Sequence, residues 1–196
     1  MTTWICKGPL AALALTALAA CEGGQGAGLL DGLGTTIGPK ERAFSQVNMA
    51  GGAVILKAPR GFCIDGHSLK QRFALMARCD KLGAPAAAAG AAPLGVITVS
   101  LSKAVPNTGL PDPTVTATAL GLSNVSDLSG DDTTVIFRAT GPAPTEDLDE
   151  KHWRATALVN GQILGLALYG AKDGQEVSDE GREILTSVIE RTRTAN

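Results

Sequence analysis

Residues 152–169 read HWRATALVNGQILGLALY, and this stretch decides the fold. Asn160 and Gly161 separate two runs rich in apolar residues, and a type I′ turn requires a positive φ at both of its central positions. The pair therefore predicts a two-residue β-hairpin. Because such a turn fixes the register, the expected cross-strand pairs are Val159/Gln162, Leu158/Ile163, Ala157/Leu164, Thr156/Gly165, Ala155/Leu166, Arg154/Ala167, Trp153/Leu168 and His152/Tyr169.

The two faces of this hairpin differ in character, since directly opposed residues share a face. One face alternates Trp or Ala with Leu, a small-against-large pattern that suits a helix packed across it. The other face becomes polar away from the turn, where His152, Arg154 and Tyr169 are expected to cluster. A cation, an imidazole and a phenol side by side can recognise an anionic or aromatic group. These three residues are a candidate binding face, and an ordinary solvated edge is the alternative.

A closing helix follows the hairpin. Ser178 is expected as its N-cap, with Asp179 and Glu180 in the first turn, where acidic side chains are favoured. Its apolar stripe is Ile184, Leu185, Val188 and Ile189. The stripe predicts that the helix packs back on the Ala/Leu face of the hairpin. Residues 42–196 should therefore form a single small α+β domain, an antiparallel sheet with a C-terminal helix on one face.

Upstream of the hairpin, runs with β-branched residues indicate further strands at residues 53–57, 94–102 and 133–139. Periodicity alone leaves residues 73–79 ambiguous between helix and strand, and a strand is expected because the run is short and leads into a turn at 80–83. In the strand at 94–102, Ile97, Val99 and Leu101 should face the core. Residues 62–69 predict a turn with one possible helical turn, 84–93 an irregular connection, and 114–122 a short helix. The acidic run at 145–150 favours a helical turn capped by Thr145, with a Ca²⁺ site as the alternative.

The amino-terminal segment has the layout of a secretory signal. Lys7 is its only charged side chain, and an apolar run from Pro9 to Ala20 ends in small residues. The run is shorter than the about 20 apolar residues that a membrane-spanning helix needs. It ends in Leu18-Ala19-Ala20-Cys21. The position of Cys21 directly after the small residues indicates a site of lipid attachment. The alternative is an ordinary signal peptide in which this cysteine has no role.

This segment resembles the signal of bacterial lipoproteins. The resemblance implies removal of residues 1–20, diacylation of the Cys21 thiol and acylation of its new amino group. In such proteins an aspartate after the cysteine commonly retains the protein in the inner membrane, whereas this chain has Glu22. The expected location is thus the periplasmic face of the outer membrane, with the inner membrane less favoured. Residues 21–41 carry seven glycines and predict a flexible tether.

The charge balance excludes some classes of partner. The formal net charge of −2 becomes −3 without residues 1–20, and no run of Lys or Arg is present. Nucleic acid is therefore not an expected partner, and attachment to the membrane should come from the lipid at Cys21.

Cys63 and Cys79 are the cysteines that remain besides Cys6 in the signal and Cys21. Because the periplasm is oxidising, they are expected to form a disulfide. The alternative is chemistry at Cys63, as a thiolate beside His67 or as part of a metal site with His67, Cys79 and His152.

Two further resemblances follow from the strand order and short motifs. The Trp-led strand, Asn-Gly turn, Leu-rich strand and closing helix resemble the end of PsbP-like α/β domains, which mostly serve as accessory subunits. The segments GFCID at 61–65 and ARCD at 77–80 are similar to those of uncharacterised alphaproteobacterial envelope lipoproteins.

Motifs of common catalytic classes are absent from the sequence, including Gly-x-Ser-x-Gly, the phosphate-binding Gly-x4-Gly-Lys and His-Glu-x-x-His. We expect a non-enzymatic lipoprotein that binds an envelope protein or a small ligand, without a cofactor or metal. A small periplasmic enzyme or metal-binding protein using Cys63, His67, Cys79 or His152 is the alternative.

Overall fold

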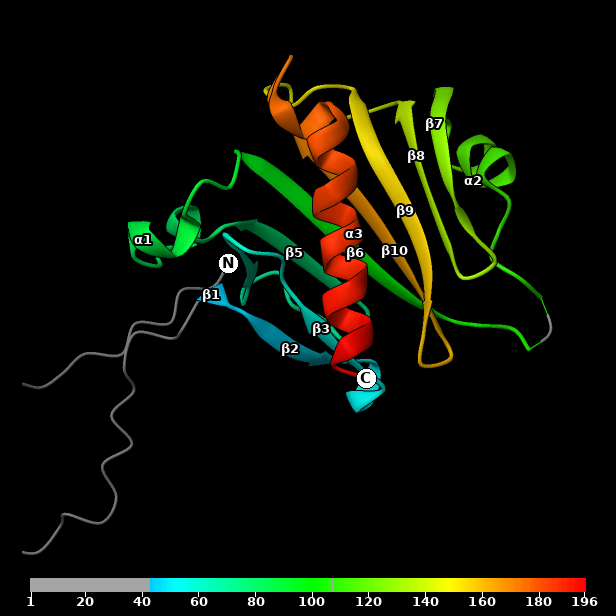
Figure 1. The fold of residues 1–196 in the computed structure, drawn as a ribbon, viewed down its shortest axis with the longest axis horizontal. Coiled ribbons are helices and arrows are strands. Elements are labelled where there is room, and N and C mark those ends of the chain that lie inside the picture. The colour runs from blue at the N-terminus through cyan, green and yellow to red at the C-terminus, as the bar shows by residue number, and fades with distance from the viewer. Residues whose placement is uncertain (1–42, 107) are drawn as a thin grey trace, which may run out of the picture. The chain divides into compact units, whose positions relative to one another are not determined.

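The computed structural model describes residues 43–106 and 108–196. Within them, eight strands form one antiparallel sheet in the order β1-β4-β5-β6-β10-β9-β8-β7, and β2 and β3 form a separate two-stranded ribbon (Figure 1). The signal at 1–20 and the tether at 21–41, with Cys21, lie outside the described residues. The strands are β1 (Ala43–Phe44), β2 (Gln46–Met49), β3 (Val54–Lys57), β4 (Phe62–Asp65), β5 (Phe73–Arg78), β6 (Gly95–Lys103), β7 (Ser123–Asp131), β8 (Thr134–Thr140), β9 (Lys151–Val159) and β10 (Gln162–Gly170).

The helices are few, and most of them are short. The α-helices of the described residues are α1 (Ala86–Ala89), α2 (Pro113–Ala119) and α3 (Asp179–Thr194), and the 3-10 turns are η1 (Ala50–Gly52), η2 (Cys79–Leu82) and η3 (Gln175–Val177). Only α3 is long enough to cover a large part of the sheet, and it crosses the face of the sheet in Figure 1. The expected fold class, an antiparallel sheet with a C-terminal helix packed on one face, is confirmed.

The central hairpin has the predicted register. Asn160 and Gly161 have φ values of 44° and 70°, as a type I′ turn requires. Val159 lies opposite Gln162 and Trp153 opposite Leu168, and the pairs between them follow without a shift. Two residues of local turn chemistry therefore determine which side chains of β9 and β10 point to each face.

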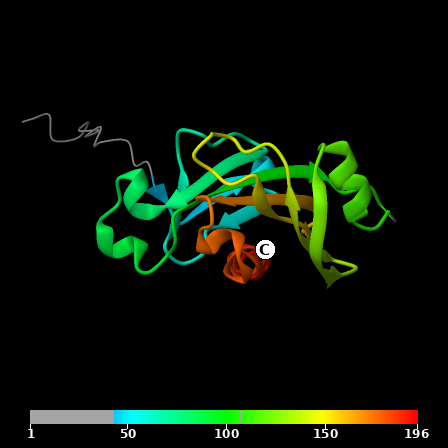
Figure 2. The same ribbon diagram turned by 90° about the horizontal axis from the view of Figure 1, so that it is seen from above.

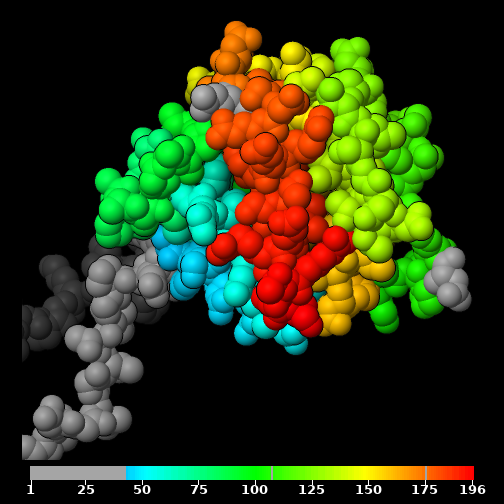
Figure 3. All heavy atoms as spheres, viewed as in Figure 1, coloured from blue at the N-terminus to red at the C-terminus, as the bar shows by residue number. Residues whose placement is uncertain are grey.

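The core lies between the sheet and α3. Leu185, Val188 and Ile189 of α3 are buried against Trp153 and Leu164, while Ile184 packs at the margin. The β2–β3 ribbon covers the core beside the helix, and the space-filling view shows α3 lying between this ribbon and the β7–β8 side of the sheet (Figure 3). The predicted apolar stripe of the helix and the inward orientation of Ile97, Val99 and Leu101 are both confirmed.

Several local predictions were wrong. Residues 62–65 form strand β4, because Phe62, Cys63 and Ile64 pair with β5, and the turn begins only at Asp65. Ala86–Ala89 form a single helical turn inside the connection expected to be irregular. Thr145–Leu148 is a turn closed by one backbone hydrogen bond rather than a helical turn. Strands β1, β2 and β7 were not predicted.

Candidate functional site

The hairpin register brings His152, Arg154 and Tyr169 together on the face of the sheet that does not contact α3. Arg154 Nε donates a hydrogen bond to His152 Nε2 at 2.9 Å, and one terminal Arg154 nitrogen donates to the Tyr169 hydroxyl at 3.0 Å. The imidazole and phenol rings stack with their centroids 4.5 Å apart. The three side chains therefore form one connected group, which we call the Arg154 cluster.

His152 is neutral in this arrangement. Its Nε2 accepts from Arg154, so its proton lies on Nδ1, which donates to the Glu150 carbonyl at 2.7 Å. Burial lowers the pKa of His152 to about 4, against the hydrogen bond to the Glu150 carbonyl, which raises the pKa, and the charge of Arg154 lowers it by a smaller amount. A neutral imidazole serves here as the acceptor that orients the Arg154 guanidinium.

Arg154 lacks the partner that a partly buried arginine usually has. Burial lowers its pKa, yet a guanidinium remains protonated at neutral pH. Among residues 43–106 and 108–196, it forms no ion pair with a carboxylate, and its two hydrogen-bond acceptors are neutral. Buried charges are normally paired. The cluster thus carries a positive charge that these residues do not balance.

The cluster is less exposed than the sequence suggested. His152 is 0% exposed and Tyr169 5%, whereas Arg154 remains partly exposed. The connection between β8 and β9 arches over this side of the sheet, opposite α3, and Asp149 N–H donates to the Gly170 carbonyl at 2.9 Å (Figure 2). An ordinary solvated edge is therefore the wrong description of these residues. Their role in binding stays a prediction, with Arg154 as the side chain that reaches the surface.

A small cavity of about 200 Å³ adjoins Arg154. Gly165 lines it from the sheet, and Thr116 of α2 and Leu120, directly after α2, line it from the helix side. Its polar lining residues are Thr98, Ser100, Thr116, Thr156 and Arg154.

Helix α2 is held by a local cap. Asp112 accepts hydrogen bonds from the backbone N–H groups of Thr114 and Val115 at 2.8 and 3.1 Å, and these bonds lower the pKa of Asp112. Pro113 occupies the first turn, where its missing N–H causes no loss. The cap fixes where α2 begins and hence where Thr116 meets the sheet.

The hydroxyl wall was missed at the sequence level, although part of its signal is present. Thr98 and Ser100 occupy the non-core positions of β6, and Gly165 interrupts the Leu-rich run of β10 opposite Thr156. A glycine opposite hydroxyl-bearing residues on both neighbouring strands indicates a hollow in the surface of the sheet. The contribution of Thr116 could not be predicted from the sequence, because only tertiary packing brings α2 to this place.

Cys63 and Cys79 lie at disulfide distance, with their sulfur atoms 2.03 Å apart and their Cα atoms 4.8 Å apart. Neither sulfur is a thiolate in this state. His67 is exposed, and its backbone N–H bonds to Asp65, whereas His152 belongs to the Arg154 cluster. The structure therefore does not gather Cys63, His67, Cys79 and His152 into one site.

For the acidic run at 145–150, a Ca²⁺ site is the alternative that the sequence offers. Glu146, Asp149 and Glu150 line an open hollow of about 830 Å³ with Asp173. The Asp149 carboxylate accepts from the backbone N–H groups of Lys151 and Asp173. Across the part of the chain that the structure describes, no group of three or more His, Cys, Asp or Glu side chains is arranged to hold a metal ion.

Comparison with known proteins adds no family. No protein-family model matches the chain, and a search of curated proteins finds no match either. No helix in the described ranges is long and apolar enough to cross a membrane.

Proposed function

We propose that this chain is a non-enzymatic periplasmic lipoprotein, anchored in the outer membrane through Cys21, whose domain recognises an envelope protein or small ligand at the Arg154 cluster. The observation that carries the binding role is the partly buried Arg154 without a carboxylate partner among the described residues. Such a charge is more stable when a bound group of opposite sign lies beside it. The residues Leu18–Cys21 support the anchor.

Three further observations favour this role over catalysis. The Cys63 and Cys79 sulfurs are joined, so neither is available as a nucleophile. His152 is buried and both of its ring nitrogens are in contact with Glu150 or Arg154, which leaves it no free position to act as a general base. The resemblance to PsbP-like domains, which mostly serve as accessory subunits, also favours an accessory role.

Membrane fractionation tests the anchor. Replacing Cys21 with Ala removes the acylated thiol, so the variant should move from the membrane fraction to the soluble periplasmic fraction. Replacing Cys6 with Ala leaves Cys21 in place and is the matched control. Continued sedimentation of the Cys21→Ala protein with membranes would contradict the anchoring proposal.

Crosslinking in intact cells tests the binding role. Arg154→Met keeps the length of the side chain and removes its charge, so the crosslinked partner should be lost while the domain stays folded. Arg72→Met removes one positive charge from an exposed arginine that contacts Gln162, and it should retain the partner. Equal recovery of the partner with both variants would exclude the Arg154 cluster as the recognition site.

Titration of free thiols tests the non-enzymatic reading. In the mature protein, with Cys21 acylated and Cys6 removed, no thiol should react before reduction, and two should react after it. A reactive thiol in the unreduced protein would favour chemistry at Cys63 or Cys79 instead.

A further inference from the structure

We propose that the cavity beside Arg154 binds one tetrahedral oxyanion group of the phosphate type, held by the Arg154 guanidinium and the hydroxyls of Thr98, Ser100, Thr116 and Thr156. This inference rests on the proposed binding role of the Arg154 cluster and names the chemistry of its ligand.

The cavity exists because one strand position has no side chain. A Cβ atom placed on Gly165 would come within 2.7 Å of Ser100 Oγ, and it would otherwise meet only the Ser100 carbonyl oxygen, at 3.9 Å. The space above Gly165 is thus open apart from one hydroxyl. Thr156 on β9 and Ser100 on β6 flank it, since both lie opposite Gly165 in the sheet.

The lining decides the sign of the ligand's charge. No carboxylate lines the cavity, and Arg154 brings a positive charge that has no ion pair among the described residues. Ser100 Oγ contacts the Gly165 carbonyl at 3.3 Å, whereas within residues 43–106 and 108–196 the hydroxyls of Thr98, Thr116 and Thr156 make no protein hydrogen bond. Hydroxyls can donate to an anion while Arg154 supplies the charge. The positive charge of Arg154 disfavours a cation there.

The volume decides the size of the bound group. Pockets for whole drug-sized ligands measure about 300–1,000 Å³, and this cavity of about 200 Å³ is smaller. It can hold a small oxyanion or the terminal group of a larger molecule. The donors come from β6, β9 and α2, which lie on different sides of the space. Donors in several directions suit a tetrahedral group better than a planar carboxylate.

The test is an NMR titration of the full mature protein, purified with its anchor in a non-ionic detergent. Inorganic phosphate, sn-glycerol 3-phosphate and acetate are added separately at constant ionic strength. Phosphate should shift the amide signals of Thr98, Ser100, Thr156 and Gly165 in a saturable way. Tighter binding of the ester would identify a phosphomonoester or lipid headgroup as the source, and tighter binding of phosphate the free ion. Acetate binding as tightly as phosphate would overturn the tetrahedral assignment.

Variants locate the binding in the cavity. Gly165→Ala places a methyl group in the cavity without changing any charge and should abolish the saturable shifts. Arg154→Met and Thr156→Val should each weaken binding, Arg154→Met by about tenfold or more, because a hydrogen bond to a charged group contributes at least that factor. Arg72→Met should bind as the wild type does. If Gly165→Ala folds poorly, the near-isosteric Thr156→Val variant tests the site instead. Phosphate binding by Thr156→Val that equals that of the wild type would then overturn the oxyanion site.

The outcomes separate this inference from the proposed function. Absence of saturable phosphate shifts, or their persistence in Gly165→Ala, overturns the oxyanion site. If the crosslinked partner is nevertheless lost in Arg154→Met cells, the binding role of the cluster stands without this ligand. If phosphate binds but the partner is retained, the cavity is a ligand site and the partner is recognised elsewhere.

Discussion

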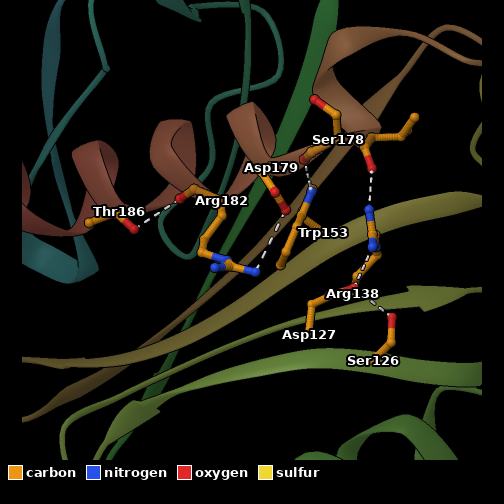
Figure 4. Close-up of polar contacts among 9 residues, drawn as sticks. Ser126, Asp127, Arg138, Trp153, Ser178, Asp179, Arg182 and Thr186 are labelled. Atoms are coloured by element: carbon orange, nitrogen blue, oxygen red, sulfur yellow. Dashed lines mark hydrogen bonds and ion pairs between the residues drawn. The ribbon is translucent and has the colours of Figure 1, made fainter.

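Trp153 and Arg154 are consecutive residues of β9, yet they belong to opposite faces of the sheet with different chemistry. Trp153 is fully buried under α3, where its Nε1–H donates to the Ser178 carbonyl at 2.6 Å. The guanidinium groups of Arg138 and Arg182 lie 5.3 and 5.0 Å from its ring (Figure 4). Both arginines have a carboxylate partner, Asp127 and Asp179 respectively.

Arg154, on the other face, has only neutral partners. The pairing of Arg138 with Asp127 is accompanied by a lowered pKa of Asp127, to which the Ser126 hydroxyl contributes most and Arg138 second among the favourable contacts. The two arginines that lie over Trp153 are thus paired with carboxylates, whereas Arg191 and Arg193 of α3 donate to backbone carbonyls. Arg154 differs from all four because its acceptors are neutral side chains, and it lies beside a cavity.

The largest expected effect concerns these two neighbours. Trp153→Ala removes a fully buried ring and should lower the free energy of unfolding by about 3–5 kcal/mol. Arg154→Met keeps the buried stem of the side chain and should change it by less than about 1 kcal/mol. Urea denaturation at pH 7 measures both. Similar losses in the two variants would mean that Arg154 is a structural residue and that the contrast between the faces is wrong.

Acidity should affect the face that carries His152. The pKa of His152 is about 4 in the folded protein, against 6.5 ordinarily, because the buried ring is hard to charge. Between these values the unfolded chain binds a proton that the folded chain does not, so stability falls as the pH drops from about 6.5 to about 4. A shift of this size corresponds to at most roughly 3 kcal/mol. Arg154 and Asp149 are the charged groups that act on the ring, in opposite directions.

Urea denaturation across this pH range measures the effect. Between pH 6.5 and pH 4, the unfolding free energy of the wild type should fall relative to that of His152→Gln by at most roughly 3 kcal/mol. The unfolding free energy of His67→Gln, a change at an exposed position, should vary with pH as that of the wild type does. Parallel curves for the wild type and His152→Gln would show that the ring is not held neutral.

The smallest expected effect compares two glycines. A Cβ atom on Gly181 of α3 would lie 2.3 Å from Trp153 Cδ1 and 2.1 Å from the Glu176 carbonyl oxygen. This overpacking costs about 1–3 kcal/mol, which exceeds the helix propensity of about 1 kcal/mol that alanine adds. Gly181→Ala should therefore be destabilised, whereas Gly165→Ala projects into the cavity and should stay within about 1 kcal/mol of the wild type. Thermal unfolding measures which of the two variants is less stable. If Gly165→Ala were the less stable one, the space above Gly165 would already be filled.

The central hairpin and α3 could be predicted because their signals are local. Asn160-Gly161 determines a turn by itself, and the stripe of Leu185, Val188 and Ile189 repeats with the helical period. Strand β7 has no such signal, since all nine of its residues are exposed and its pairing with β8 contains register shifts. Without a buried side, a strand shows no alternation of apolar residues.

The candidate site was predictable only in part. The hairpin register brought His152, Arg154 and Tyr169 to one place on the sequence alone. The burial of His152 and Tyr169 and the cavity wall from Thr116 depend on segments that fold over the sheet from elsewhere in the chain. Nothing in the local sequence of residues 113–119 or 141–150 states which face they will cover.

The link between Cys63 and Cys79 also sets how the domain responds to mechanical load. A force applied ahead of Ala43 first reaches β1, which is paired to β4 through only two residues. We expect this short pairing to separate first. The covalent link then halts the extension at Cys63, because the chain between the two cysteines, 16 residues apart, cannot lengthen. In a single-molecule stretching experiment, reduction should therefore release roughly 50 Å of additional contour length, the extended span of these residues less the 4.8 Å between the two Cα atoms.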